Sequence, residues 1–296
     1  MTDTTLLHQG DALHRFLFEF HPVRGELVRL DRTWRTVQAR RHYPAPVRRA
    51  LGEALAATAL LRASVKFEGN LTLQLQSDGP LRLLLVQSRH GSELRALARW
   101  HEVDEEAGFD ALCGTGNLAV TIEPDQGRER YQGLVEIDPA GIGPSLERYF
   151  ARSEQLPTRL LLTASSSTAA GLLLQRLPGE SLDPDAWNRI VHLGTSVTRE
   201  ELLGTETATL LRRLFHEETV RLFNAQPLAF HCDCSRQRTA AMLVGLGADE
   251  ARSILAEQGR VIVTCQFCGL DYVFDAVDIA QLFADGAQPD TRDILH

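Results

Sequence analysis

Four cysteines near the C-terminal end of the chain are the side chains best suited to chemistry. Cys232 and Cys234 are separated by one residue, and Cys265 and Cys268 are separated by two. A structural zinc ion takes four ligands in a tetrahedron, and two close cysteine pairs that the fold brings together can supply them all. The spacing therefore predicts one Zn²⁺ per chain, held by these four thiolates.

Three alternatives to this interpretation stay open. A C-x-x-C pair can be a thioredoxin-like redox centre, but a helix should follow it, whereas LDYVF after Cys268 indicates a strand. The four thiols could also be unrelated buried groups, or His231 could replace one of them as a ligand. The strand, turn and strand expected over 261–274 favour zinc, because this is the shape of a zinc knuckle. The fifth cysteine, Cys113, is predicted to be a small core residue.

The composition is that of an ordinary soluble globular protein, with 44% hydrophobic and 24% charged residues and a net charge of −8. No apolar run approaches the roughly 18 residues of a membrane helix, and the first residues do not resemble a secretory signal. We therefore expect a cytoplasmic protein with no membrane partner. Cytoplasmic thiols are kept reduced, so clustered cysteines indicate metal or redox chemistry rather than structural disulfides.

Three zones are expected to position the cysteines: an α/β domain over 1–179, a helical linker over 180–230 and a zinc-binding module over 231–296. Apolar residues three and four apart from Pro46 to Val65 predict a helix in the first zone, and a shorter helix is expected at 143–155. Alternating and apolar runs predict a mostly antiparallel sheet, in which the two segments that begin Gly-Asn-Leu form similar hairpins. The strands and hairpins are expected at 15–20, 23–30, 69–88, 116–138, 158–164 and 169–177. The predicted fold class is α+β.

The linker zone has an amphipathic helical pattern that Gly194 and Gly204 interrupt. Four apolar residues share one side of it: Leu210, Leu211, Leu214 and Phe215. Frequent Thr and Val lower its helix propensity, and short helices of this kind depend on packing against a neighbour. The linker is therefore either a stable helical subdomain or a marginal segment that can melt.

The last zone has only 66 residues, so its hydrophobic core is small. Ser235 is predicted to cap a helix that runs to about Leu246; helices at 248–259 and 277–283 complete the module. Zinc binding to such sites contributes about 10–16 kcal/mol. Oxidants attack thiolates and convert them to disulfides, which cannot hold the ion. Oxidation is therefore expected to unfold this module, and to loosen the linker if the linker leans on it.

The charge of the last zone bears on a further alternative, a zinc protein that binds nucleic acid. Ten acidic residues against five arginines leave residues 231–296 with a balance of −5. Nucleic acid favours a basic surface. The sequence therefore predicts no nucleic-acid partner.

Four motifs, in order, resemble the bacterial redox-regulated holdase chaperones, the family of thirty-three-kilodalton heat-shock proteins. The strongest is C-x-C-S-R followed by C-x-F-C-G-x-x-Y-x-F, from Cys232 to Phe274. The others are RYQGLVEI from Arg130, YFARSEQLPT from Tyr149 and GLLLQRLPG from Gly171. The resemblance covers nearly the whole chain, and the four cysteines match it without departure.

The resemblance implies a switch. Reduced protein would bind zinc and be inactive, whereas oxidants would form Cys232–Cys234 and Cys265–Cys268 disulfides, release zinc and unfold the linker. The domain 1–179 would then bind unfolding client proteins without ATP, and a homodimer would form on activation. We therefore predict a holdase chaperone rather than an enzyme. A thiol–disulfide oxidoreductase that uses Cys265 and Cys268 is the enzymatic alternative.

Overall fold

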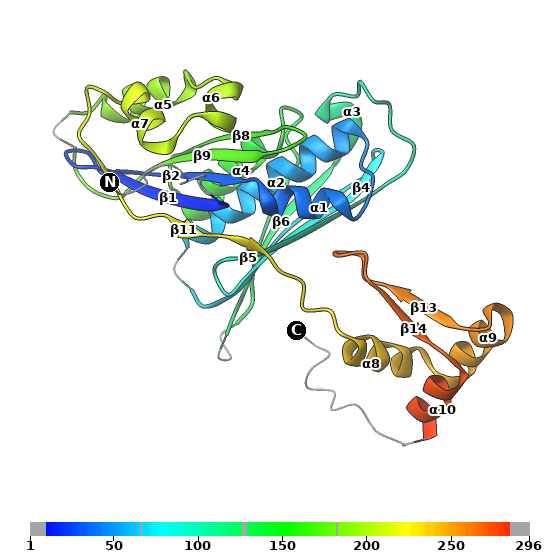
Figure 1. Ribbon diagram of the computed structural model, residues 1–296. Helices are drawn as coiled ribbons and strands as arrows, with labels where there is room; N and C mark the ends of the chain where they lie inside the picture. Colours follow the sequence, from blue (N-terminus) through cyan, green and yellow to red (C-terminus); the bar gives the residue numbers. More distant parts are fainter. Residues whose placement is uncertain (1–9, 66, 126–128, 182, 285–296) are drawn as a thin grey trace, which may run out of the picture. The chain divides into compact units, whose positions relative to one another are not determined.

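The computed structural model describes residues 10–284, except residues 66, 126–128 and 182. The chain divides into two compact units, Met1–His231 and Cys232–His296 (Figure 1). The first contains the sheets and most of the helices, and residues 180–230 belong to it. The second contains the four clustered cysteines. Among the described residues, no helix has the length and apolarity to span a membrane.

Two sheets form the first unit, and all their strand pairs except one are antiparallel. The first sheet has the order β10-β1-β2-β9-β8, with β11 also paired to β1: Ala12–Phe18 (β1), Val23–Leu30 (β2), Thr158–Ala164 (β8), Ala169–Arg176 (β9), Val220–Leu222 (β10) and Gln226–Pro227 (β11). The second has the order β12-β5-β4-β3-β6-β7: Gly69–Ser77 (β3), Leu81–Arg89 (β4), Glu93–Trp100 (β5), Gly116–Pro124 (β6), Tyr131–Glu136 (β7) and Ala229–Phe230 (β12). The predicted α+β class with a mostly antiparallel sheet is confirmed.

The two hairpins predicted from the Gly-Asn-Leu segments are β3–β4 and β6–β7. They lie side by side, because β3 also pairs with β6 along its whole length. Strand β5 was not predicted; it pairs with β4 and extends the sheet on its other side. The two similar segments therefore form adjacent halves of one sheet.

Helix α2 (Ala45–Ser64) contacts strands of both sheets, so the main core lies around it. Of the apolar positions predicted to face inward, Val47, Leu51, Leu55 and Leu61 are buried, whereas Val65, just past the end of the helix, is half-buried. The sequence did not predict α1 (Arg32–Ala39) or α3 (Phe109–Cys113). The short helix expected at 143–155 is α4 (Ile142–Tyr149), which continues as a π-helical turn over Phe150–Glu154.

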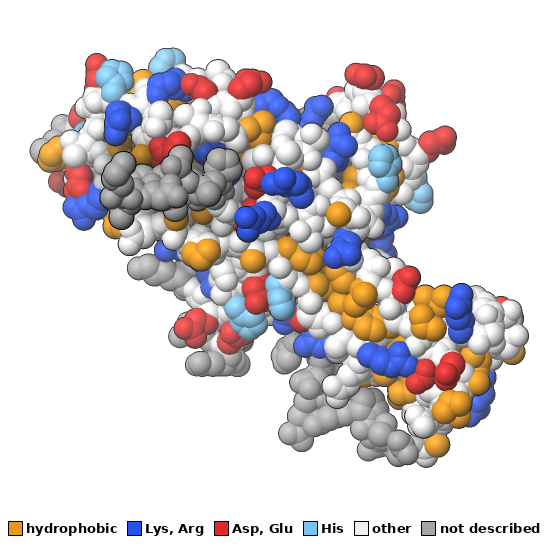
Figure 2. Space-filling view, viewed as in Figure 1, with side chains coloured by type: hydrophobic (Ala, Val, Ile, Leu, Met, Phe, Trp, Pro, Cys, Tyr) orange, Lys and Arg blue, Asp and Glu red, His pale blue; other side chains and the backbone are white. Residues whose placement is uncertain are grey.

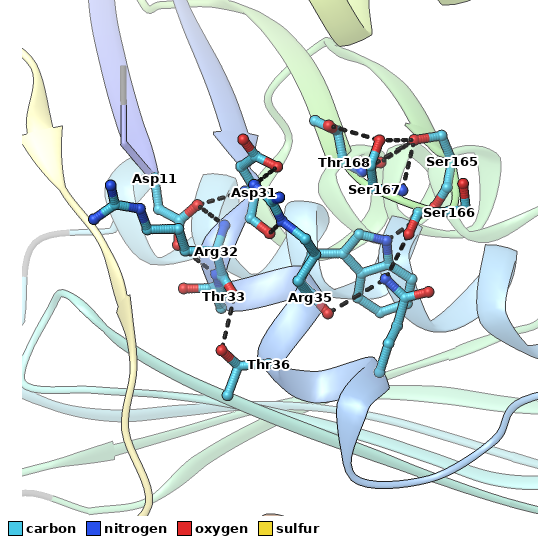
Figure 3. A network of polar contacts seen from close by, with 12 residues as sticks. Asp11, Asp31, Arg32, Thr33, Arg35, Thr36, Ser165, Ser166, Ser167 and Thr168 are labelled. Carbon is cyan, nitrogen blue, oxygen red and sulfur yellow. Dashed lines mark hydrogen bonds and ion pairs between the residues drawn. The ribbon is translucent and has the colours of Figure 1, made fainter. Parts of the chain in front are cut away.

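Helix α1 is held by groups that are distant in sequence (Figure 3). The carboxylate of Asp11 accepts hydrogen bonds from the backbone N–H groups of Arg32, at 2.9 Å, and Thr33, at 2.6 Å. The indole of Trp34, which is fully buried, donates to the carbonyl of Ser165 at 2.9 Å. These contacts replace a local cap and fix α1 to the loop between β8 and β9.

The linker zone forms three short helices that cover the first sheet on the side away from α2: α5 (Ala186–Thr195), α6 (Arg199–Gly204) and α7 (Thr207–Leu214). The four apolar residues predicted to share a side are all buried there, against a cluster that includes Phe16, Phe18 and Leu172. The expectation of helix is wrong beyond α7. Residues 219–231 are extended instead, because their backbone groups pair with the edges of the two sheets.

The second unit contains α8 (Arg236–Leu246), α9 (Ala248–Gln258), the hairpin of β13 (Val261–Thr264) and β14 (Asp271–Phe274), and α10 (Ala276–Ala284). The Ser235 hydroxyl accepts from the N–H of Arg238 at 3.2 Å, which confirms the predicted cap. Gly247 and Gly259 end α8 and α9 in conformations with positive φ, 103° and 71°, that favour glycine. Five buried residues form the core: Leu243, Ala251, Val261, Phe274 and Ile279.

Candidate metal centre

The fold brings the four cysteines predicted as ligands to one place. Cys232 and Cys234 lie on the extended segment before α8, and Cys265 and Cys268 lie in the turn between β13 and β14. All four sulfurs are within 4.8 Å of one another. The closest contacts join one pair to the other: the sulfurs of Cys232 and Cys265 are 3.7 Å apart, and those of Cys234 and Cys268 are 3.2 Å apart.

This arrangement fits one metal ion. Four sulfurs at about 2.3 Å from a tetrahedral zinc ion would be about 3.8 Å from one another, close to the separations seen here. All five cysteines are free thiols, and the clustered sulfurs are too far apart for a bond of about 2.05 Å. The Cys265 carbonyl accepts from the N–H of Gly269 at 2.7 Å, and the Cys265 N–H donates to the carbonyl of Leu270 at 2.9 Å. The turn is therefore the compact knuckle that the sequence predicts.

The thiols differ in how readily they ionise. Burial raises the pKa of Cys232 and Cys268, and the neighbouring thiols add to this rise. Burial also acts to raise the pKa of Cys234, but hydrogen bonds from Tyr272 and the other thiols outweigh it and lower this pKa. Cys234 is therefore the thiol of these three that loses its proton most readily. Through repulsion, its negative charge then disfavours ionisation of the neighbouring thiols. A bound cation would remove that repulsion.

Two residues outside the cysteine set hold the cluster in place. The hydroxyl of Tyr272, on β14, lies 3.2 Å from the sulfur of Cys234 and donates to it. Arg236, two residues after Cys234, donates to the carbonyl of Val273 at 2.6 Å, pairs with Asp278 at 2.7 Å and stacks 4.3 Å from the ring centre of Phe274. Arg236 thus fastens the start of α8 to β14 and α10. Sequence reasoning quoted both residues within motifs but assigned them no role, because the role depends on the register of the hairpin.

The structure also decides several alternatives. A strand, β14, follows Cys268, so the helix required by a thioredoxin-like centre is absent from this described stretch. His231 is not part of the four-residue group; its Nδ1 atom lies 3.9 Å from the carboxylate of Glu93 in the first unit. Cys113 is fully buried, and burial raises its pKa to about 12. Its predicted place in the core is confirmed.

The fold and the site define a class: an α+β protein with a large two-sheet unit and a small unit built around four clustered thiols. A family model described as Hsp33 protein matches residues 11–275. The 33 kDa chaperonin of Nitrosococcus oceani is 46% identical over 290 residues, covering 98% of this chain and 100% of the relative. That of Ectopseudomonas mendocina is 48% identical over 283 residues, covering 93% and 96%.

A solved structure is similar as well. The crystal structure of the 33 kDa chaperonin (heat shock protein 33 homolog) of Thermotoga maritima has a TM-score of 0.80 and 23% identity, covering 92% of this chain and 97% of that one. The chain belongs to the Hsp33 family. It is therefore a chaperone of the stress response, as the resemblance in the sequence predicted.

Proposed function

We propose that this chaperone is an ATP-independent holdase switched by oxidation. In the reduced state Cys232, Cys234, Cys265 and Cys268 hold one Zn²⁺. Oxidation releases the ion, and the chain then binds unfolding proteins. The observation that carries the proposal is the cluster of four sulfurs within 4.8 Å in a unit whose described residues place five side chains in the buried core.

The second unit buries little apolar surface for its size. Six of its large hydrophobic residues are exposed, more than its core contains: Met242, Leu246, Ile262, Leu270, Val273 and Val277. Figure 2 shows apolar side chains on the surface of this unit. A core of this size needs a further source of stability. A bound zinc ion would supply about 10–16 kcal/mol and the positive charge that four thiolates require.

Oxidation by peroxide would convert the thiolate ligands to disulfides. Two thiolates give two electrons to one peroxide molecule, which takes up two protons and leaves as two water molecules, and the sulfurs form a disulfide. Following the family resemblance, we assign the pairs as Cys232–Cys234 and Cys265–Cys268. A sulfur in a disulfide is no longer a thiolate ligand, so the ion leaves and the unit loses its main support.

We further propose that loss of the second unit loosens the linker helices, which pack on the first sheet. Helices α5, α6 and α7 have ten, six and eight residues, too short to be stable without their packing on the first sheet. Helix α6 also borders a cavity of about 450 Å³ whose lining includes the charged residues Glu53, Glu147, Arg159 and Arg199. These features favour the interpretation of the linker as a segment that can melt. Melting would expose the apolar cluster of Phe16, Phe18 and Leu172 to clients.

Other parts of the proposal rest on the sequence. The P-loop of many ATPases needs a lysine after glycine, and the only lysine here, Lys66, follows valine, which favours action without ATP. We propose a cytoplasmic protein that dimerises on activation and acts by binding rather than catalysis. The strand after Cys268 disfavours an oxidoreductase, and the −5 balance of residues 231–296 disfavours nucleic acid.

The test compares reduced and peroxide-treated chain as suppressors of light scattering by a heat-aggregating client, with zinc release followed by a chromogenic chelator. We expect one zinc per reduced chain, its release on oxidation and protection by the oxidised form. Equal protection by the two forms would reject the switch.

A further inference from the structure

The last stretch of the first unit, residues 219–231, covers one edge of each sheet. We call it the edge segment. Its strands β10 and β11 pair antiparallel with β1, and its strand β12 pairs parallel with β5. Without it, β1 and β5 would be the outermost strands at these ends of their sheets. Figure 1 shows this stretch, in yellow, running along β1 and on to β5.

The edge segment is held mainly through its backbone. Four of its N–H groups donate to edge carbonyls at 2.9 to 3.1 Å: Phe223 to Arg15, Leu228 to Asp11, Ala229 to Ser92 and His231 to Leu94. The carbonyl of Thr219 accepts from Glu19 at 3.0 Å in return. Bonds of this kind depend little on which side chains the bound strand carries. The edges therefore recognise an extended chain rather than a particular sequence.

Some side chains of the edge segment add to its binding: Arg221 pairs with Glu19 at 2.8 Å, and the amide of Gln226 donates to the carbonyl of Gly91 at 3.0 Å. Only Leu228 is buried, while Val220 and Phe230 are half-buried against the two apolar cores of the first unit. Leu222 and Phe223 are 37% and 41% exposed. A bound strand thus gains apolar contacts at three positions, beside the polar contacts that Arg221 and Gln226 make here.

The β1 edge presents a preformed hydrogen-bond acceptor to an added strand. The carboxylate of Asp11 caps α1, while the carbonyl of the same residue accepts from Leu228 (Figure 3 shows the cap). The acceptor is therefore positioned by α1, which contacts β12 of the edge segment but is also anchored by β5, α2 and the carbonyl of Ser165. An edge that keeps its form after release is a template for another strand.

We propose that these two edges bind clients, which add an extended apolar segment as a new strand, and that the edge segment occupies them as an internal substitute in the resting chain. This inference rests on the proposed function and specifies the client surface. Unfolded proteins share a backbone but no sequence, so recognition through main-chain hydrogen bonds suits them. His231 is followed directly by Cys232, so unfolding of the second unit frees one end of the edge segment.

The test uses the full chain and a fluorescein-labelled peptide with the sequence of residues 219–231. The matched control is the same peptide N-methylated at the positions of Phe223, Leu228, Ala229 and His231, which removes the four donors and keeps every side chain. We expect the unmodified peptide to bind the oxidised chain, measured by fluorescence anisotropy, and to bind the reduced chain at least tenfold more weakly. The methylated peptide should bind about 30-fold more weakly or worse, because it loses four hydrogen bonds. An unfolded client should displace the unmodified peptide.

Equal binding of the two peptides, or binding of neither, would overturn the inference even if the oxidised chain protects clients. Binding that a client does not displace would also overturn it. If the client does not displace the peptide and peptide binding weakens at higher concentrations of the oxidised chain, the edges bind a second copy of the chain instead. Failure of the oxidised chain to suppress client scattering is a separate result, which rejects the proposed function, because the anisotropy comparison of the two peptides needs no client.

Discussion

The hydroxyl of Tyr272 offers a sharp test of how the metal centre is supported. It donates to the sulfur of Cys234 at 3.2 Å, and this bond favours the thiolate over the thiol. Hydrogen bonds to charged groups contribute about 1.5–3 kcal/mol, and loss of a residue that supports a metal ligand typically lowers metal affinity about 10- to 100-fold. Because Tyr272 is half-buried, we expect Tyr272→Phe to fall in the lower half of that range.

The measurement is zinc transfer from the reduced chain to a chromogenic chelator of known affinity. Tyr272→Phe keeps the ring that packs on the core of the second unit, so the fold should be retained, and circular dichroism checks this. The matched control is Tyr131→Phe, which removes the same atom from a partly exposed tyrosine of the first unit. If Tyr272→Phe binds zinc within twofold of the unchanged chain, the hydroxyl does not stabilise the thiolate and the reasoning is wrong.

Three further predictions concern the two units. Removing the metal with a chelator under reducing conditions should lower helicity through loss of α8, α9 and α10; an unchanged circular dichroism spectrum would contradict the role given to the ion. Phe274→Ala removes the largest buried side chain of the second core and the ring under Arg236, so it should destabilise this unit by about 3–5 kcal/mol and speed its amide hydrogen exchange. Glu26 is 1% exposed, its Oε2 has no hydrogen-bond partner among the described residues, and burial raises its pKa from 4.5 to about 7, against the pull of Arg24 and Arg15. The folded state therefore holds this proton more tightly, so stability is greatest below pH 4.5 and falls by about 3 kcal/mol as the pH rises to 7. Glu26→Gln should remove that slope in urea unfolding followed by tryptophan fluorescence, since all three tryptophans lie in the first unit; an unchanged slope would assign it to other groups.

Much of the second unit follows from short-range signals. The spacing of Cys232, Cys234, Cys265 and Cys268 identified the cluster, and Ser235 and a glycine at 245 or 247 marked the two ends of α8, because capping depends on residues within one turn of a helix end. Helix α2 could be predicted in the same way, because its apolar residues recur three and four apart within a short stretch of sequence. The sequence of the chain by itself therefore determined the cysteine cluster, the caps of α8 and the family.

Only the tertiary structure decided which partners these elements meet. Helix α1 lacks a local cap and takes one from Asp11, about twenty residues earlier, and the edge segment pairs with β1 about two hundred residues away. The contact of Tyr272 with Cys234 likewise depends on the hairpin register that places Tyr272 opposite Val263. Backbone groups carry no sequence signature, and a sheet edge accepts any extended strand that reaches it. Which strand arrives is set by packing across the whole unit, and no short window of residues contains that information.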